Sequence, residues 1–193
     1  ATHLTVRDCE FSENEMGILP GVNHFSDVVI ERSQFTHNGN DHTHAHNVYI
    51  GAQRSLVFRS NVSTGARIGH QLKSRAANNL VEGNRFEDGP DGESSYLADF
   101  PAGGEVVFKD NYLQKGPKAQ NITMLAYGLE KSLHEKNSLE VRGNTFVNQR
   151  AGPCNVAFIK MLKSPAIVQG NAFNACSRVV GLARQHDNTR RGR

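Results

Sequence analysis

The stretch that decides the fold of this chain is LEVRGNTF, residues 139–146. It begins with two apolar residues separated by one polar residue, continues through a glycine to Asn144, and ends with Phe146 two places later. Apolar and polar residues that alternate have the period of a β-strand and not of a helix. The stretch therefore predicts a short strand, a bend at the asparagine, and a second residue that faces inward.

Imperfect copies of this stretch recur from one end of the chain to the other. The positions that correspond to the asparagine are Cys9, Ser33, Asn61, Asn84, Asn111, Asn144 and Asn171. Consecutive positions are separated by 24, 28, 23, 27, 33 and 27 residues. Seven copies at a bounded period indicate a repeat architecture, in which each unit packs on the next one.

A single short strand cannot bury its own apolar face, whereas stacked copies share one continuous core. A step of 23 to 33 residues suits one turn of a parallel solenoid. We therefore predict an all-β fold, a right-handed parallel β-helix (solenoid) of about seven coils. It forms a single domain over residues 1–183, and a basic C-terminal tail follows over residues 184–193. A leucine-rich horseshoe, the alternative repeat fold, needs many more leucines than this chain contains.

An asparagine at a fixed place after each strand fits a sharp bend, where its amide satisfies backbone groups and stacks on the asparagine of the next coil. The predicted asparagine ladder consists of Asn61, Asn84, Asn111, Asn144 and Asn171. The predicted phenylalanine stack consists of Phe11, Phe35, Phe86, Phe146 and Phe173. Coil three breaks this stack, because Ser63 stands where the phenylalanine should be.

Composition agrees with a narrow solenoid and excludes some functions. The chain of 193 residues is long enough for one domain, and its 18 glycines and lack of tryptophan suit many turns around a thin core. A net charge of +3 is too small to indicate nucleic-acid binding, and we expect no such partner. No apolar run is long enough to span a membrane, and no signal peptide is visible, so the chain is interpreted as a mature form or as part of a longer protein.

The three cysteines do not have the spacing of a metal site. Cys154 and Cys176 are 22 residues apart, which is close to one turn of the solenoid and allows a disulfide between adjacent coils. The favoured interpretation is that they are small, buried residues of the coil wall.

An alignment of the second strands of coils two to four predicts which side chains share a face. It places Ile50, Leu72 and Ala98 in one inward row. It also gives two outward rows, Tyr49 with Gln71 and Leu97, and Gly51 with Lys73 and Asp99. Adjacent coils lie about 4.8 Å apart, so this register predicts an ion pair between Lys73 and Asp99.

The same face carries the main candidate site, because His70, Lys73 and Arg75 lie on the outer strand of coil three and Tyr96 lies on coil four. Arg75 can neutralise a carboxylate through two parallel hydrogen bonds. Lys73, His70 or Tyr96 can take a proton from the neighbouring carbon or donate one to a leaving oxygen. This combination suits an acidic polymer. The expected substrate contacts are His46, Tyr49, Gln71 and Asp99. In the alternative interpretation, these charges only line the coil wall.

A second candidate is a metal site in coil two. His42, His44 and His46 alternate, so an extended segment would project all three on one side, and Asp41 would add a carboxylate. Such a set predicts a divalent metal, zinc or calcium. The alternative is that His44 and His46 are hydrogen-bonded turn residues and His42 is solvated.

A third candidate is a pair of carboxylates for glycoside hydrolysis, which requires one on each side of the bond that breaks. The available cluster is Asp91, Glu93 and Asp99. Asp91 and Glu93 lie in a turn rich in proline and glycine, where solvated acids are the usual interpretation.

Three segments carry a resemblance to a known family: HNVYIG at 46–51, GHQLKSRA at 69–76 and SYLADFP at 95–101. Together with the repeat, they resemble the right-handed parallel β-helix proteins of the pectate-lyase-like superfamily, and more closely a bacterial group described as right-handed β-helix repeat proteins. The superfamily includes polysaccharide lyases, uronan epimerases, polygalacturonase-type hydrolases and phage tail proteins. The chain departs from the polygalacturonase pattern, because Gln71 follows His70, and it lacks the Arg-x-Pro-x-x-Arg segment of pectate lyases.

The leading hypothesis is a secreted or periplasmic, monomeric, carbohydrate-active protein that binds an acidic polysaccharide along coils two to four, as a polysaccharide lyase. Arg75 or a divalent metal would neutralise the uronate carboxylate, and Lys73, His70 or Tyr96 would serve as base and acid in β-elimination. The alternatives are a non-catalytic carbohydrate-binding or structural β-helix and a glycoside hydrolase. No membrane partner is expected.

Overall fold

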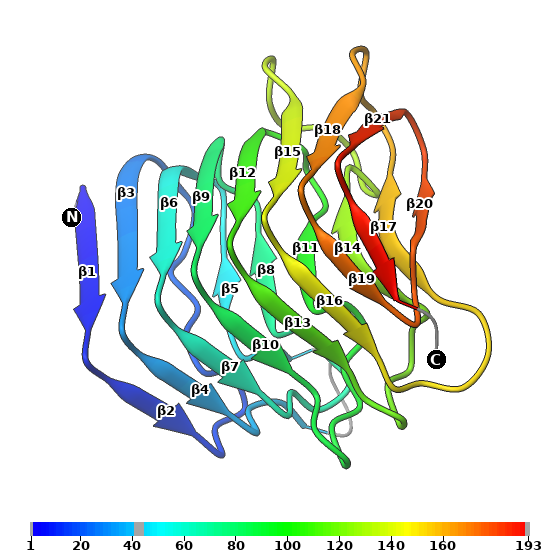
Figure 1. Ribbon diagram of the computed structural model, residues 1–193. Helices are drawn as coiled ribbons and strands as arrows, with labels where there is room; N and C mark the ends of the chain where they lie inside the picture. The colour runs from blue at the N-terminus through cyan, green and yellow to red at the C-terminus, as the bar shows by residue number, and fades with distance from the viewer. Residues whose placement is uncertain (1, 41–44, 192–193) are drawn as a thin grey trace.

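The computed structural model describes residues 2–40 and 45–191 of the chain. All regular secondary structure in these ranges is β-strand, and the chain winds through the strands in successive coils (Figure 1). No helix in the described ranges is long and apolar enough to cross a membrane. The coils stack through three sheets whose strands all pair in parallel.

The first sheet contains, in order, β1 (His3–Arg7), β3 (Asn23–Glu31), β6 (Gln53–Arg59), β9 (Asn78–Glu82), β12 (Glu105–Lys109), β15 (Ser138–Arg142), β18 (Ala166–Gln169) and β21 (Ala183–His186). The second contains β2 (Glu10–Ser12), β4 (Gln34–Thr36), β7 (Val62–Thr64), β10 (Arg85–Glu87), β13 (Tyr112–Lys115), β16 (Thr145–Asn148), β19 (Ala172–Asn174) and β22 (Thr189–Arg191). The third contains β5 (Tyr49–Ile50), β8 (Leu72–Ser74), β11 (Ala98–Phe100), β14 (Thr123–Tyr127), β17 (Asn155–Ile159) and β20 (Arg178–Val180).

The stretch at residues 139–146 spans the corner between the first two sheets. Leu139 and Val141 of β15 and Phe146 of β16 are buried in the core, and Asn144 occupies the bend between the strands. Gly143, just before the asparagine, has a φ of 67°, a left-handed conformation that glycine adopts at little cost. This geometry confirms the predicted all-β parallel solenoid.

The predicted asparagine ladder is present. The backbone N–H and the side-chain amide of Asn84 both donate to Oδ1 of Asn111, each at 2.9 Å, and the same arrangement links Asn111 to Asn144. At the N-terminal side the ladder continues through smaller groups, since the Ser33 N–H donates to Asn61 and the Cys9 N–H donates to the Ser33 hydroxyl. The ladder therefore satisfies the backbone at one corner of every coil, which buried polar groups require.

The prediction of a basic tail outside the solenoid over residues 184–193 is wrong for its described part, although most of these residues are exposed. Residues 183–191 add β21 to the first sheet and β22 to the second. Between these strands Asn188 accepts a hydrogen bond from the Asn171 N–H at 2.9 Å and so forms a further rung of the ladder. Within the described residues, the first two sheets thus have eight strands each, one more than the seven copies found in the sequence.

The phenylalanine stack is present at both ends of the solenoid and interrupted in the middle. The rings of Phe11 and Phe35 stack at 5.0 Å, whereas coil three has no phenylalanine in this row. Phe58, from the first sheet, fills the gap and lies 6.1 Å from Phe35 and 6.0 Å from Phe86. The core therefore stays aromatic across coil three, although its ring comes from a different sheet.

Ser63, which breaks the stack, belongs to a buried polar network at the corner between the second and third sheets. Its hydroxyl accepts a hydrogen bond from the Asn47 side chain and donates one to the Gln71 carbonyl, both at 3.0 Å. Ser63, Asn47 and Gln71 are all fully buried. The loss of phenylalanine at this coil therefore makes room for an internal network and not for a surface site.

Cys154 and Cys176 form a disulfide, with their Cα atoms 5.6 Å apart. They occupy the turns that precede β17 and β20, which are neighbours in the third sheet, so one turn of the solenoid brings them together. The interpretation of these residues as separate wall residues is therefore wrong. Cys9 is a free, exposed cysteine.

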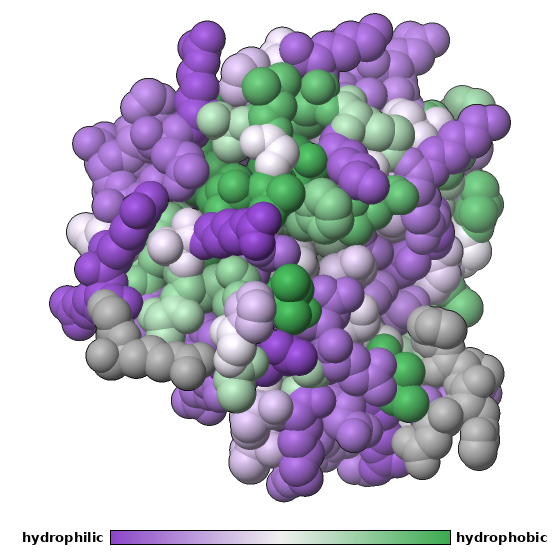
Figure 2. All heavy atoms as spheres, turned by 90° about the vertical axis from the view of Figure 1, so that its right-hand side faces the viewer, coloured by the Kyte–Doolittle hydropathy of each residue, from purple (hydrophilic) through white to green (hydrophobic). Residues whose placement is uncertain are grey.

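The apolar core extends to the C-terminal coils. Figure 2 views the molecule from their side and shows apolar side chains gathered in the middle of this face, with hydrophilic residues around them. Val179 and Val180 of β20 are partly exposed, and Leu182 is 48% exposed.

Candidate functional site

The third sheet brings Tyr49, Lys73 and Asp99 into one outward row. Tyr49 of β5 pairs with Lys73 of β8, and Lys73 pairs with Asp99 of β11. The predicted ion pair is present, because Nζ of Lys73 lies 3.7 Å from Oδ2 of Asp99. Three consecutive coils therefore place a phenol, an ammonium and a carboxyl group beside one another.

The predicted register between coils two and three is wrong by two residues. Ile50 pairs with Ser74 and not with Leu72. The polar interior explains the shift, since the Asn47 amide donates to Oε1 of Gln71 at 2.7 Å and locks these coils together. The predicted pairing of the next two coils, Leu72 with Ala98, is confirmed.

Gln71 lies inside the solenoid, so its predicted contact with substrate is wrong. Its side chain is fully buried and donates hydrogen bonds to the Glu87 carbonyl and to the Asp88 carboxylate. Leu97, expected in the same outward row, is also fully buried. The chain turns a corner at Gln71 and Leu97, directly before β8 and β11 begin. The alternation of inward and outward side chains within the strands therefore does not extend to these two residues.

A carboxylate that sequence reasoning missed, Glu130, completes a charged cluster. Its Oε1 lies 3.1 Å from Nζ of Lys73, and its Oε2 accepts a hydrogen bond from the Arg75 guanidinium. Arg75 also donates to the Tyr49 hydroxyl, and its Cζ lies 5.2 Å from the centroid of the Tyr49 ring. We call Tyr49, Lys73, Arg75, Asp99 and Glu130 the charged cluster.

Glu130 belongs to the loop between β14 and β15, residues 128–137, which folds back over coils three and four. The Glu130 N–H donates to the Pro101 carbonyl at 2.9 Å, and Nε2 of His134 lies 3.0 Å from the Arg75 carbonyl. The sequence carries one signal of this loop, because the step from Asn111 to Asn144 is the longest of the repeat. Extra residues in one coil of a solenoid map to a loop on one face.

His46, His70 and Tyr96 form an aromatic column beside the cluster. The rings of His46 and His70 stack at 4.6 Å, and those of His70 and Tyr96 at 5.0 Å. Nδ1 of His46 accepts the His70 N–H, and Nδ1 of His70 accepts the Tyr96 N–H. Both imidazoles therefore use one nitrogen to hold the next coil, which places the proton of the neutral ring on Nε2.

His70 does not suit the predicted role of proton acceptor. Burial lowers the pKa of His70 well below its usual value, with a smaller contribution from the His46 ring. The lone pair of its neutral ring is already engaged by the Tyr96 N–H. Burial likewise raises the pKa of Tyr96, which keeps its phenol protonated at neutral pH. His70 is therefore a positioning residue of the wall.

Asp99 is the titratable group of the cluster. It is 2% exposed, and burial raises its pKa to about 7, against the opposing charge of Lys73. Its Oδ1 is buried without a hydrogen-bond partner among the described residues. Asp99 therefore acts beneath the surface, and the prediction that it contacts a substrate directly is wrong.

The predicted metal site falls mostly on residues 41–44, which lie outside the described residues. Its remaining member, His46, is 4% exposed and stacked on His70. The described part of the chain contains no group of three or more His, Cys, Asp or Glu side chains that could hold a metal ion. The metal site stays a prediction.

The predicted hydrolase pair is not supported by the surroundings of its members. Asp91 lies in an exposed turn, where a hydrogen bond from Lys118 lowers its pKa, so it stays ionised and unsuited to donate a proton. The charged groups that act on Asp99 are Lys73, Glu130 and Arg75. Asp91 is thus exposed and paired with Lys118, whereas Asp99 is buried in the charged cluster.

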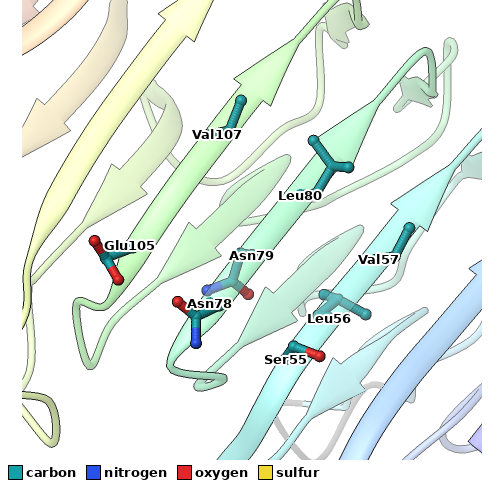
Figure 3. Close-up of a pocket in the computed structure, with 8 residues that line it drawn as sticks. All are labelled: Ser55, Leu56, Val57, Asn78, Asn79, Leu80, Glu105 and Val107. Carbon is teal, nitrogen blue, oxygen red and sulfur yellow. The ribbon is translucent and has the colours of Figure 1, made fainter.

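A shallow hollow on the outer face of the first sheet is a separate feature (Figure 3). Its lining comes from β6, β9 and β12 and consists of Ser55, Leu56, Val57, Asn78, Asn79, Leu80, Glu105 and Val107. Half of these residues are aliphatic, and none is cationic. The hollow and the charged cluster therefore lie on different sheets and differ in chemistry.

Comparison with known proteins identifies the scaffold. A family model described as a right-handed β-helix region matches residues 1–173. No curated protein matches the chain, and no solved structure matches it. The matched residues include every member of the charged cluster.

Proposed function

The chain belongs to the right-handed β-helix family, and on this scaffold we propose that it recognises an acidic polysaccharide through Tyr49, Lys73 and Arg75. A fold hosts many functions, so the argument rests on the side chains of the site. The observation that carries the proposal is the convergence of Lys73 and Arg75 on one carboxylate, that of Glu130. The same donors suit the carboxylate of a uronic acid.

An aromatic ring beside two cations also suits a sugar. The ring centroid of Tyr49 lies 5.8 Å from Nζ of Lys73 and 5.2 Å from Cζ of Arg75, so the ring holds both cations in place. Tyr49 is partly exposed, and its ring offers an apolar surface next to its hydroxyl. A uronate residue presents both complementary parts, an anionic group and an apolar ring face.

The outer face of the third sheet carries a second aromatic–cation pair beyond the charged cluster. The row of Tyr49 and Lys73 continues through Asp99 and Ala126, which are both buried, and reaches Phe158, where Nζ of Lys160 lies 5.2 Å from the ring centroid. Two aromatic–cation pairs thus occur on one face, four coils apart, which corresponds to about 19 Å. That separation fits a polymer better than a single sugar.

A polysaccharide lyase is the second candidate, and the position of Asp99 favours it. Lys73 would pass a proton from its ammonium to the Asp99 carboxylate, which lies 3.7 Å away. The neutral amine would then take the proton on the carbon next to the uronate carboxylate. A carbon–carbon double bond would form as the bond to the leaving oxygen breaks, and that oxygen would keep the electron pair and take a proton from the Lys73 ammonium. Arg75 would stabilise the charge on the uronate carboxylate. Burial raises the pKa of Asp99 to about 7, so this carboxyl group can hold a proton near neutral pH.

The location that fits this function is outside the cytoplasm. The disulfide between Cys154 and Cys176 supports it, because disulfides persist in secreted and periplasmic proteins and are rare in the cytosol. A polysaccharide ligand is also met there.

Incubation of the protein with alginate, pectate, glucuronan and a neutral glucan tests the proposal. Binding is measured by electrophoresis in gels that contain each polymer, and elimination by the ultraviolet absorbance of the unsaturated product. Retardation by acidic polymers alone supports recognition, and a gain of absorbance adds lyase activity. New reducing ends without absorbance would indicate a hydrolase. No retardation and no product with any acidic polymer contradicts the proposal.

A further inference from the structure

The contact between Glu130 and the two cations closes the site against a ligand. One carboxylate oxygen of Glu130 pairs with Nζ of Lys73, and the other accepts a hydrogen bond from Arg75. These are the hydrogen bonds that an incoming carboxylate would need. Arg75 has a second partner, the Tyr49 hydroxyl, which does not compete for the same position. The side chain of Glu130 therefore occupies the place of the ligand anion.

We infer that Glu130 is an internal carboxylate that determines the specificity of the site, because a ligand binds only when it displaces this side chain from Lys73 and Arg75. This inference rests on the proposed function. It names the ligand class more narrowly, as a polymer with several carboxylates and not a single uronic acid or a neutral glycan.

The loop that carries Glu130 is anchored in a way that leaves its side chain as the mobile part. The Glu130 N–H donates to Pro101, the Leu133 N–H donates to Ala102, and the Gly104 N–H donates to the Asn137 side chain. The side chain of Glu130 is 46% exposed, whereas those of Lys73 and Arg75 are 13% and 20% exposed. Rotation of one exposed side chain therefore opens the cations while the loop backbone keeps its position.

The exchange of one carboxylate for another explains the expected selectivity. A monovalent uronate gains the hydrogen bonds that Glu130 gives up, so its net gain is small. A polymer adds contacts along the face toward Phe158 and Lys160 and presents further carboxylates at high local concentration. A neutral glycan cannot replace the charge-assisted hydrogen bonds and leaves the cations unpaired.

The variant Glu130→Gln tests this inference, with Glu135→Gln as a matched control. Glu135 lies in the same loop and is exposed, so both variants remove one negative charge from the same region. Affinity for a short oligogalacturonate and for galacturonate is measured by isothermal titration calorimetry on the wild type and both variants. Circular dichroism confirms that each is folded. Glu130→Gln should bind the oligomer about tenfold more tightly or better, since hydrogen bonds to charged groups contribute about 1.5–3 kcal/mol.

The outcomes separate this inference from the proposed function. A gain confined to Glu130→Gln, and lost in the double variant Arg75→Ala/Glu130→Gln, supports both. Wild-type binding that Glu130→Gln leaves unchanged or weakens overturns the role of Glu130 and leaves the proposed function standing. An equal gain in Glu135→Gln overturns the role of Glu130, because it would come from net charge alone. An absence of binding in every variant overturns both.

Discussion

At the scale of the residue, two opposing effects, burial and the charge of Lys73, set the pKa of Asp99. Burial raises its pKa from 3.8 to about 7, although Lys73 lies within ion-pair distance. Between these two pH values the folded protein binds one more proton at this site than the unfolded chain does. The stabilising contribution of Asp99 is therefore fully present below the unfolded pKa and is lost as the pH rises to about 7.

The variant Asp99→Asn should remove this pH dependence. Asparagine stays uncharged, so between about pH 4 and about pH 8 the variant should lose less free energy of unfolding than the wild type, by on the order of 2–4 kcal/mol. Urea unfolding at both pH values measures the difference. The pKa of His70 is lowered and works in the opposite direction, and its Nε2 lies 3.4 Å from Oδ2 of Asp99, so the difference between the two proteins includes the effect of Asp99 on this ring. Parallel pH profiles for the two proteins would contradict the assignment of Asp99.

The residues of the site could be predicted only in part. Lys73, Arg75 and Tyr49 stand out in the sequence as a cationic and aromatic group, and the pairing of Lys73 with Asp99 followed from the repeat. Glu130 could not be placed, because it lies 57 residues from Lys73 in the chain and reaches it through a loop that obeys no repeat. The polar corner that shifts the register of coil two also has no counterpart in an alternating pattern.

At the scale of the element, the asparagine ladder ties each coil to the next. Its interior rungs are buried and saturated with hydrogen bonds. Each rung from Asn84 to Asn188 accepts two donors from the coil before it, so removal of one interior side chain leaves two buried N–H groups unpaired. The terminal rung, Asn188, is partly exposed, and water can replace its oxygen there.

The variant Asn111→Ala should lower the free energy of unfolding by about 3 kcal/mol or more, because the Asn84 backbone and side-chain N–H groups lose their acceptor. Asn188→Ala is the matched control at the end of the ladder and should cost about 1 kcal/mol. Denaturant unfolding of both variants checks the gradient. Equal losses at the two positions would show that the ladder contributes little beyond local packing.

Ser63→Phe provides a second test at this scale. The repeat alone suggests that phenylalanine would complete the stack and stabilise the protein. The structure gives the opposite expectation, because a ring at this position would displace the hydroxyl from Asn47 and Gln71 and overpack a space that Phe58 fills. The variant should lose about 3 kcal/mol or more of unfolding free energy. A variant more stable than the wild type would refute this reading of the corner.

The elements themselves were largely predictable, because the repeat sets strand, bend and core at once. The exception is Asn188. Gln185 and Arg190 replace the apolar residues of the template there, and basic composition suggested a tail. A better signal is the dipeptide of the bend: the residue before each rung has a positive φ, and Asp187 before Asn188 has one of 51°. A small or turn-forming residue followed by asparagine would have revealed the eighth copy.

At the scale of the whole molecule, the disulfide secures the coils near the C-terminal end. Cys154 and Cys176 close a loop across 22 positions of the chain, and in the chain-entropy model such a link stabilises by about 3 kcal/mol. The double variant Cys154→Ala/Cys176→Ala should therefore unfold at lower urea concentration. The exposed Cys9→Ser is the control and should stay within about 0.5 kcal/mol of the wild type. Equal stability of the double variant and the wild type would contradict this role of the disulfide.

The fold class could be predicted from the sequence because a solenoid depends on contacts between neighbouring repeats, which recur in the chain. A site on its surface depends on which residues of different coils and loops meet. The charged cluster draws on three adjacent coils and on one loop, so it became visible only once the register and the path of residues 128–137 were known.

The measurement that tests the central claim most directly is the affinity of Arg75→Ala for polygalacturonate. Arg178→Ala is the matched control, since Arg178 is exposed on β20 of the same sheet and its removal changes the net charge equally. Affinity electrophoresis or calorimetry, with circular dichroism to confirm the fold, compares both with the wild type. We predict that Arg75→Ala loses about tenfold or more in affinity and that Arg178→Ala loses little. Equal affinity of Arg75→Ala and the wild type would contradict recognition of the polymer by the charged cluster.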